Sequence, residues 1–381
     1  MNEQKYNLDQ SLAELDKLVD LSAKETDKTA CEALAEKART IYEQYPESED
    51  IALRYARILF NLSVEQENVE DLLNTTKEVK QIFDSFKHSE DIALHYTRTL
   101  ANLSFEQENV EDLLNTTKEV KQIFDSFKHS EDIALHYAMA LANLSFEQEN
   151  VEDLLNTVNS VKQIFDSFKH SESIALHYAM ALVNLSAKQD QVEDLLKTSK
   201  AVKQIFEQFK DSEDIALQYA MVLYNLSNRQ NDIKERKKTI SDLEALTLKF
   251  QHSENIALQY ATALVNLSAE QINVEERKNT ANLVKQIFEQ FKDSEDIALQ
   301  YAMVLYNLSN RQNDIKERKK TISDLEALTL KFQHSENIVL QYATALANLS
   351  VEQDNVEERL NTVNEVKQIF DSFKHSESIA L

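Results

Sequence analysis

The sequence predicts an all-α protein built as an α-solenoid, and three observations carry this prediction. The pattern Ser-Glu-x-Ile recurs at a fixed step of 41 residues, from Ser48 to Ser89 and onward to Ser376. A fixed period of this length is typical of stacked repeats. The 381 residues include no Gly and one Pro, so the residues that strand turns require are almost absent. Apolar residues recur at helical spacing within each period.

The unbroken period also predicts the domain organisation. A repeat stack grows linearly without one deep core, so we expect residues 1–381 to form a single elongated domain. Residues 7–47 keep the register but are more polar, with Glu14 where later repeats have Tyr. We interpret them as a divergent N-terminal cap repeat. Eight 41-residue repeats follow at 48–375, and residues 376–381 begin a further, truncated repeat.

The first half of each repeat predicts a helix, shown here for residues 89–129. Ser89 is a good N-cap residue, and the acidic residues behind it favour the positive end of the helix dipole. Ile92, Tyr96 and Leu100 then recur at helical spacing. We expect this helix to continue to about Gln107. The glutamine at this position recurs in every repeat, and we interpret it as structural.

The second half predicts another helix. Asn109 precedes Val110-Glu111-Asp112, which is a second N-cap followed by acids. Apolar residues continue from Val110 through Phe127, so we expect the helix to end near Lys128. A short connection between two helices of similar length predicts an antiparallel hairpin.

Charge and composition narrow the class of partner. The net charge is −25, which disfavours nucleic acid and anionic membranes. The basic runs at 234–238 and 316–320 are interpreted as solvated helix faces. Cys31 is the only cysteine, so no internal disulfide can form. No signal peptide or membrane-spanning run is present, and the sequence therefore predicts a cytoplasmic protein.

The sequence predicts no enzyme, no cofactor and no metal site. His95, His136 and His177 occur once per repeat, about 10 Å apart, which is too far for one ion with ligands at about 2 Å. No Gly-rich phosphate loop is present. Every candidate catalytic side chain is repeated many times, whereas an active site is a unique place.

A stripe on the first helix remains for binding after the packed positions are removed. It contains Asp91, His95, Arg98 and Asn102, spaced four, three and four residues apart along one helical face. Asn does not vary at the last of these positions. The members of this Asn row are Asn61, Asn102, Asn143, Asn184, Asn225, Asn266, Asn307 and Asn348.

Two interpretations of the Asn row remain open. A carboxamide offers a donor and an acceptor together, so the row could hold the backbone of an extended peptide. Repeats advance by about 8–10 Å and a peptide by about 3.3 Å per residue, so one Asn would serve every third residue. Alternatively, each Asn could hydrogen-bond the backbone of the neighbouring repeat and lock the stacking.

The variable positions of the stripe would read the side chains of a bound peptide. Arg57 and Arg98 suit an acidic end of the ligand, and Met139, Met180 and Met221 suit an apolar middle. The side-chain-reading groove comprises Arg54, Arg57, His95, Arg98, His136, Met139, His177, Met180, Gln218, Met221, Gln259, Gln300, Met303 and Gln341.

The hairpin resembles the tetratricopeptide family. The resemblance lies in Tyr137-Ala138-x-x-Leu141, which matches the large-small-x-x-large pattern of that family's first helix. Asn143-Leu144 is similar to a run in the longer, kinesin-light-chain-like repeats. The period of 41 and the scarcity of helix-ending Pro depart from the usual pattern. The resemblance implies a right-handed superhelix of antiparallel hairpins whose first helices line a peptide-binding groove.

The predicted function is therefore a non-enzymatic scaffold that binds a protein or extended peptide. The alternative is a structural spacer or assembly rod without a groove ligand. Since no polar cap is visible at the C-terminal end, that end offers a surface for self-association.

Overall fold

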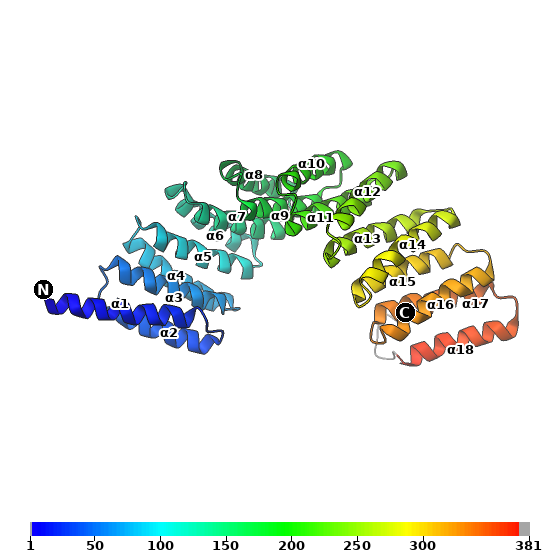
Figure 1. The fold of residues 1–381 in the computed structure, drawn as a ribbon, viewed down its shortest axis with the longest axis horizontal. Coiled ribbons are helices and arrows are strands. Elements are labelled where there is room, and N and C mark those ends of the chain that lie inside the picture. The colour runs from blue at the N-terminus through cyan, green and yellow to red at the C-terminus, as the bar shows by residue number, and fades with distance from the viewer. Residues whose placement is uncertain (1, 373–381) are drawn as a thin grey trace. The chain divides into compact units, whose positions relative to one another are not determined.

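The computed structural model describes residues 2–372, with side chains from Asn7 onward, and the predicted start of a further repeat at 376–381 lies outside this range. Residues 2–372 form eighteen α-helices and no strand. They alternate along the chain as first and second helices of nine hairpins (Figure 1).

The first helices are the odd-numbered ones, and those of the full repeats begin at the Glu behind the marker Ser. They are α1 (Asn2–Ser22), α3 (Glu49–Val64), α5 (Glu90–Glu106), α7 (Glu131–Glu147), α9 (Glu172–Lys188), α11 (Glu213–Arg229), α13 (Glu254–Glu270), α15 (Glu295–Ser309) and α17 (Glu336–Glu352). The second helices are α2 (Lys28–Tyr42), α4 (Val69–Ser85), α6 (Val110–Ser126), α8 (Val151–Ser167), α10 (Val192–Gln208), α12 (Ile233–Lys249), α14 (Val274–Gln290), α16 (Ile315–Lys331) and α18 (Val356–Ser372).

The predicted N-cap of the second helix is confirmed. The Oδ1 of Asn109 accepts hydrogen bonds from the backbone N–H of Glu111 at 2.8 Å and of Asp112 at 3.3 Å. These bonds satisfy two of the donors that a helix leaves open at its start. The serine caps are less uniform, since Ser294 accepts from Ile297 at 3.2 Å while Ser89 makes no such bond.

The first helix ends one residue before the predicted position because Gln107 adopts an extended conformation, with φ −83° and ψ 123°. Its buried Oε1 accepts a hydrogen bond from Thr116 of the second helix at 2.9 Å. The same glutamine–threonine bond recurs at Gln230–Thr239, Gln271–Thr280 and Gln312–Thr321. In these four hairpins the glutamine has a structural role, because its bond joins the end of the first helix to the second helix.

The contacts divide the chain into two compact units, residues 1–189 and 190–381. Within each unit, consecutive first helices pack side by side, as α3, α5 and α7 do (Figure 1). Within a unit, a second helix contacts the first helix of its own hairpin and the first helix of the next, as α4 contacts α3 and α5. In each unit the first helices therefore form one layer of a two-layer stack and the second helices the other.

The core of each hairpin centres on the tyrosine of the first helix. Ile92, Tyr96 and Leu100 are fully buried, and the Tyr96 ring packs on Phe83 with 5.5 Å between centroids. The Tyr96 hydroxyl donates to Glu119 at 2.5 Å. The apolar ring is therefore buried in the core, while the hydroxyl has a hydrogen-bond partner at its rim.

None of the helices among the described residues combines the length and the apolar character that spanning a bilayer requires. The described residues also contain no group of three or more His, Cys, Asp or Glu side chains placed to hold a metal ion.

Candidate functional site

The Asn row joins neighbouring first helices. The Nδ2 of Asn102 in α5 donates to the Oγ of Ser63 in α3 at 2.9 Å. The same bond recurs at Asn61–Ser22, Asn143–Ser104, Asn184–Ser145 and Asn307–Ser268, at 2.8 to 2.9 Å. Each bond connects two residues 39 positions apart, so each of these five repeats is tied to the repeat before it.

Two members of the row use a different acceptor. Asn266 donates to the Oδ1 of Asn228 at 2.9 Å, and Asn348 donates to the Oδ1 of Asn310 at 3.0 Å. Both acceptors are asparagines that directly follow the usual serine. Asn225 lies at the corresponding place in α11, half-buried like the other seven.

The serine hydroxyls take part in a second bond. Ser63 Oγ donates to the backbone oxygen of Phe60 at 2.6 Å, and Ser104 Oγ donates to that of Ala101 at 2.7 Å. Each hydroxyl therefore donates within its own helix and accepts from the next repeat. A hydroxyl carries one donor and two acceptor sites, so this arrangement uses its donor fully.

The acceptor predicted for a structural lock was the backbone of a neighbouring repeat, whereas the observed acceptor is mainly a side chain. Among the seven Asn side chains whose bonds are described above, Asn307 alone also approaches a backbone oxygen, that of Val265, at 3.4 Å. The serine hydroxyl lies closer because it projects from the helix surface, while the carbonyl is engaged inside its own helix.

The Asn row is only partly used by these bonds. One of the two Nδ2 hydrogens is donated, and for Asn102 and Asn143 no described residue donates to Oδ1. Both residues are half-buried, so one N–H and the carbonyl oxygen remain for another partner.

The His95 side chain is largely buried and leaves little surface of the stripe at this position. His95 is 8 % exposed, and its ring lies 5.9 Å from that of Phe60 in the preceding repeat. Burial, with smaller contributions from Arg98 and Arg57, lowers the pKa of His95 to about 4. Burial likewise lowers the pKa of His177 to about 4.

The other positions of the groove vary in their exposure. Arg57 is exposed, whereas the guanidinium of Arg98 lies over the Phe60 ring at 5.6 Å from its centroid. Arg54 pairs with Asp16 at 2.6 Å. Besides Arg54 and Arg98, the half-buried members are Met139, Met180, Met221, Met303, Gln218, Gln259, Gln300, Gln341, His136 and His177.

An exposed apolar row escaped the sequence analysis. Val64, Phe105 and Phe146 hold the same position in α3 and at the ends of α5 and α7, with 56 %, 70 % and 70 % of their surface exposed. They follow the Asn row by three residues and so lie on the same side of the helix. A comparison of the repeats could have indicated this row, because the residue after Asn-Leu-Ser varies between repeats while Asn-Leu-Ser itself does not.

Buried arginines were also missed, and they correct the interpretation of the basic runs as solvated faces. The lysines of both runs are exposed, but Arg236 and Arg318 are buried, as is Arg277. Arg236 donates through Nε and Nη2 to the backbone oxygen of Gln230, at 3.0 and 2.6 Å. The guanidinium thereby satisfies a carbonyl at the end of the preceding helix, which a lysine at the exposed positions could not reach.

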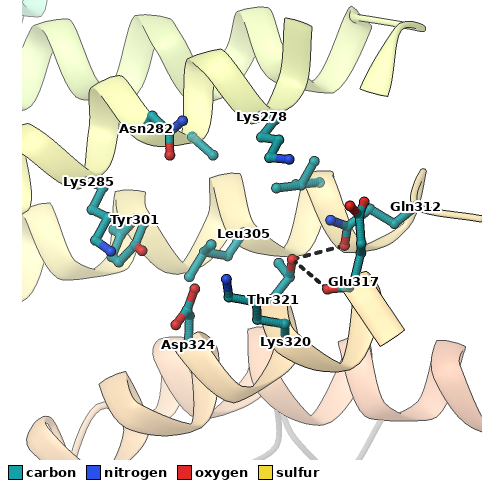
Figure 2. Close-up of a pocket in the computed structure, with 12 residues that line it drawn as sticks. Lys278, Asn282, Lys285, Tyr301, Leu305, Gln312, Glu317, Lys320, Thr321 and Asp324 are labelled. Atoms are coloured by element: carbon teal, nitrogen blue, oxygen red, sulfur yellow. Dashed lines mark hydrogen bonds between the residues drawn. The ribbon is translucent and has the colours of Figure 1, made fainter. Parts of the chain in front are cut away.

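Cavities lie elsewhere in the hairpins. Four of them, of about 270 to 370 Å³, each lie between two successive second helices, above the tyrosine of the first helix between them. Figure 2 shows the one bounded by α14, α15 and α16. None of these four cavities includes a member of the Asn row.

No family model matches the sequence, and no curated protein matches it. The chain is similar to the crystal structure of yeast Tom70, at 11 % identity, 94 % coverage of this chain, 89 % coverage of that chain and a TM-score of 0.32. It is also similar to a structure from the computational design of self-assembling cyclic protein homooligomers, at 14 % identity, 98 % and 93 % coverage and a TM-score of 0.10. Likenesses this weak carry no argument on fold or function, so the description of the chain as an all-α protein of helical hairpins rests on α1 to α18 themselves.

Proposed function

We propose that the protein is a non-enzymatic scaffold that binds a protein segment along its first helices. The observation that supports this function best is the exposed apolar row Val64, Phe105 and Phe146. Two phenylalanines of one row, each mostly in solvent, are unusual on a protein whose surface is strongly charged. Contiguous exposed apolar surface marks interaction sites.

The spacing of this row suits an extended ligand. Because α3, α5 and α7 pack side by side, the row has one apolar side chain per repeat. Packed helices lie about 8–10 Å apart, which is about three residues of extended chain. A partner segment with an apolar side chain at every third residue would match the row.

The Asn row would hold the backbone of the same segment. Asn102 precedes Phe105 by three residues on α5, so the two side chains are neighbours on one helical face. The unused N–H and Oδ1 of Asn102 can pair with one peptide unit of a ligand. The right-handed superhelix and the protein or peptide partner remain part of this proposal.

One observation favours the alternative function, a structural spacer. The Asn–Ser bonds use part of the row to join repeats, and a spacer needs no more than this. A spacer gives no reason, however, for phenylalanines to remain exposed.

Selection from a library of random peptides displayed on phage tests the two functions. The scaffold predicts that an enriched peptide family binds the full chain and that Phe105→Asn with Phe146→Asn abolishes binding. Asparagine is a native residue at this position, in Asn228 and Asn310, so the fold should be retained. Asn143→Ala with Asn184→Ala should weaken binding if the row holds the peptide backbone.

Leu248→Asn is the matched control, because Leu248 is 66 % exposed but lies on a second helix, α12. It should leave binding unchanged. If no peptide family is enriched, or if the control weakens binding as much as the phenylalanine variants, the scaffold proposal is wrong. A large fall in stability of the Asn variants with unchanged binding would show that the Asn row only locks the stack.

A further inference from the structure

The cavity between α14, α15 and α16 is lined by three lysines, more than line any of the other three cavities. It has a volume of about 270 Å³. Lys278 and Lys285 extend from α14, Lys320 from α16, and Tyr301 lies on α15 between them (Figure 2). In a chain with a net charge of −25, three lysines around one cavity are unexpected.

Within residues 2–372, none of the three lysines forms an ion pair. At the same position as Lys278, Lys237 pairs with Glu276 at 3.3 Å and Lys319 pairs with Glu358 at 2.8 Å. The corresponding acid in this cavity is Glu317, and no contact within 4.0 Å joins it to Lys278. The lysine charges are therefore not neutralised by direct pairing inside the protein.

The two neighbouring cavities carry acidic or neutral side chains at the same positions. Where this cavity has Lys285, they have Glu244 and Glu326, and where it has Lys320, they have Asn279 and Asn361. Counting Glu317 and Asp324, the cavity between α14 and α16 carries a formal charge of three minus two, which is +1. The cavity between α12 and α14 has Lys237 against Glu244 and Glu276, which is −1. The cavity between α6 and α8 has Lys118 and Lys121 against Asp153, which is also +1, but Lys121 pairs with Asp125 at 2.5 Å. Among these four cavities, three lysines without an ion pair therefore line only the cavity between α14 and α16.

The rest of the lining suits an organic anion. Burial raises the pKa of Tyr301, so its hydroxyl remains a hydrogen-bond donor at neutral pH. Leu305 and Leu308 give the cavity an apolar part beside the lysines. Lysine ammonium groups bind phosphate as point charges with rotatable donors.

We propose that this cavity binds a small organic phosphate, a phosphate monoester whose charged group contacts Lys278, Lys285 and Lys320 and whose apolar part covers Leu305 and Leu308. The site is independent of the apolar row and the Asn row, which lie on other surfaces of the hairpins. Because the lysines are exposed, binding weakens as ionic strength rises.

Calorimetric titration of the full chain with phenyl phosphate and with inorganic phosphate tests this site. We expect one saturable site for phenyl phosphate and weaker binding of inorganic phosphate, which lacks the apolar part. Lys285→Glu with Lys320→Asn should weaken phenyl phosphate binding at least about tenfold, since two charge contacts are lost. Both substitutions are native to the neighbouring cavities, so the fold should be retained, and circular dichroism checks this.

A near-copy of the cavity lining supplies the control. Lys203 and Lys238 repeat the lysine pair on α10 and α12, but Leu196 stands where this cavity has Lys278. Lys203→Glu with Lys238→Asn should leave affinity unchanged, whereas Lys278→Leu should weaken it. If phenyl phosphate does not saturate at millimolar concentration, or if the control pair weakens binding as much as the pair in the cavity, the site is not the one proposed.

Discussion

Asn102 of α5 and Ser63 of α3 form a hydrogen bond of 2.9 Å between two repeats, and Ser63 donates in turn to the carbonyl of Phe60 in its own helix. The short motif Asn-Leu-Ser thereby forms hydrogen bonds across the boundary between repeats. Its Asn donates a hydrogen bond to the repeat before it, and its Ser accepts one from the repeat after it.

Removing the Asn102–Ser63 bond should lower the free energy of unfolding by a small amount that a double-mutant cycle can measure. A hydrogen bond between neutral side chains contributes about 1 kcal/mol, so Asn102→Ala and Ser63→Ala should each lower the urea midpoint. The double variant should cost less than the sum of the two single changes. Circular dichroism is the suitable probe because the chain has no Trp. Strictly additive effects would show that the bond does not contribute.

The exposed phenylalanines should contribute little to folding. Phe105→Asn and Phe146→Asn should shift the urea midpoint only slightly, because both rings are 70 % exposed. The same changes should reduce binding of an apolar dye to the native protein. Phe124→Asn serves as the contrast, since its ring packs on Tyr137 at 5.4 Å and its loss should be clearly destabilising. Equal destabilisation at all three positions would mean that the exposed row is part of the core.

Arg318 should tolerate leucine better than alanine. It is 2 % exposed, its Nη1 contacts Glu352 at 2.6 Å, and its Nε has no partner among the described residues. Arg318→Ala leaves a cavity and should cost about 2 to 4 kcal/mol. Arg318→Leu restores the residue type of Leu113 at the same position and should change the free energy of unfolding by no more than about 1 kcal/mol. Thermal and urea unfolding distinguish these outcomes, and a leucine variant as unstable as the alanine variant would contradict the argument.

Acid should destabilise the repeat that contains His95. The pKa of His95 is lowered from 6.5 to about 4 by burial, so the unfolded chain takes up its proton first as the pH falls. Stability from the neutral ring is present above pH 6.5 and is lost as the pH falls from 6.5 toward 4. The full effect is about 3 kcal/mol, at about 1.4 kcal/mol per unit.

His95→Gln should remove this part of the pH dependence, because glutamine is native at the position in Gln259 and does not titrate. Urea midpoints of wild type and variant, compared at pH 7 and pH 5, measure the difference. The variant should lose less stability than the wild type over this interval, and parallel losses would show that His95 is not the group responsible.

Most of the fold follows from the sequence because the relevant signals are local. Asn109 caps its helix through its own side chain, and Ile92, Tyr96 and Leu100 mark the buried face by spacing alone. The end of the first helix, predicted at about Gln107, lies at Glu106, and only the structure shows that Gln107 bonds Thr116 of the next helix.

The candidate site was predicted less well because it depends on contacts between repeats. The stripe was identified, but the burial of His95 arises from Phe60 of the preceding repeat, and no pattern within one helix shows this. The exposure of Phe105 was missed because an aromatic residue beside a packed stripe is usually part of the core. Only the structure shows that the neighbouring helix does not cover this ring. Arginine is usually a surface residue, so the sequence gives no sign that Arg236 is buried. Its hydrogen bond to the Gln230 carbonyl, seen only in the structure, explains the burial.

The Asn–Ser bond also bears on how this chain grew. Donor and acceptor lie on the same helix, two residues apart, so a copied block of 41 residues brings both halves of the junction with it. Such a block fits against its own duplicate without any new complementary change. Residues 61–96 and 102–137, which are offset by 41 and differ at only one position, are a duplication of this kind. A hairpin interface that is complementary to itself makes lengthening the chain a matter of copying alone.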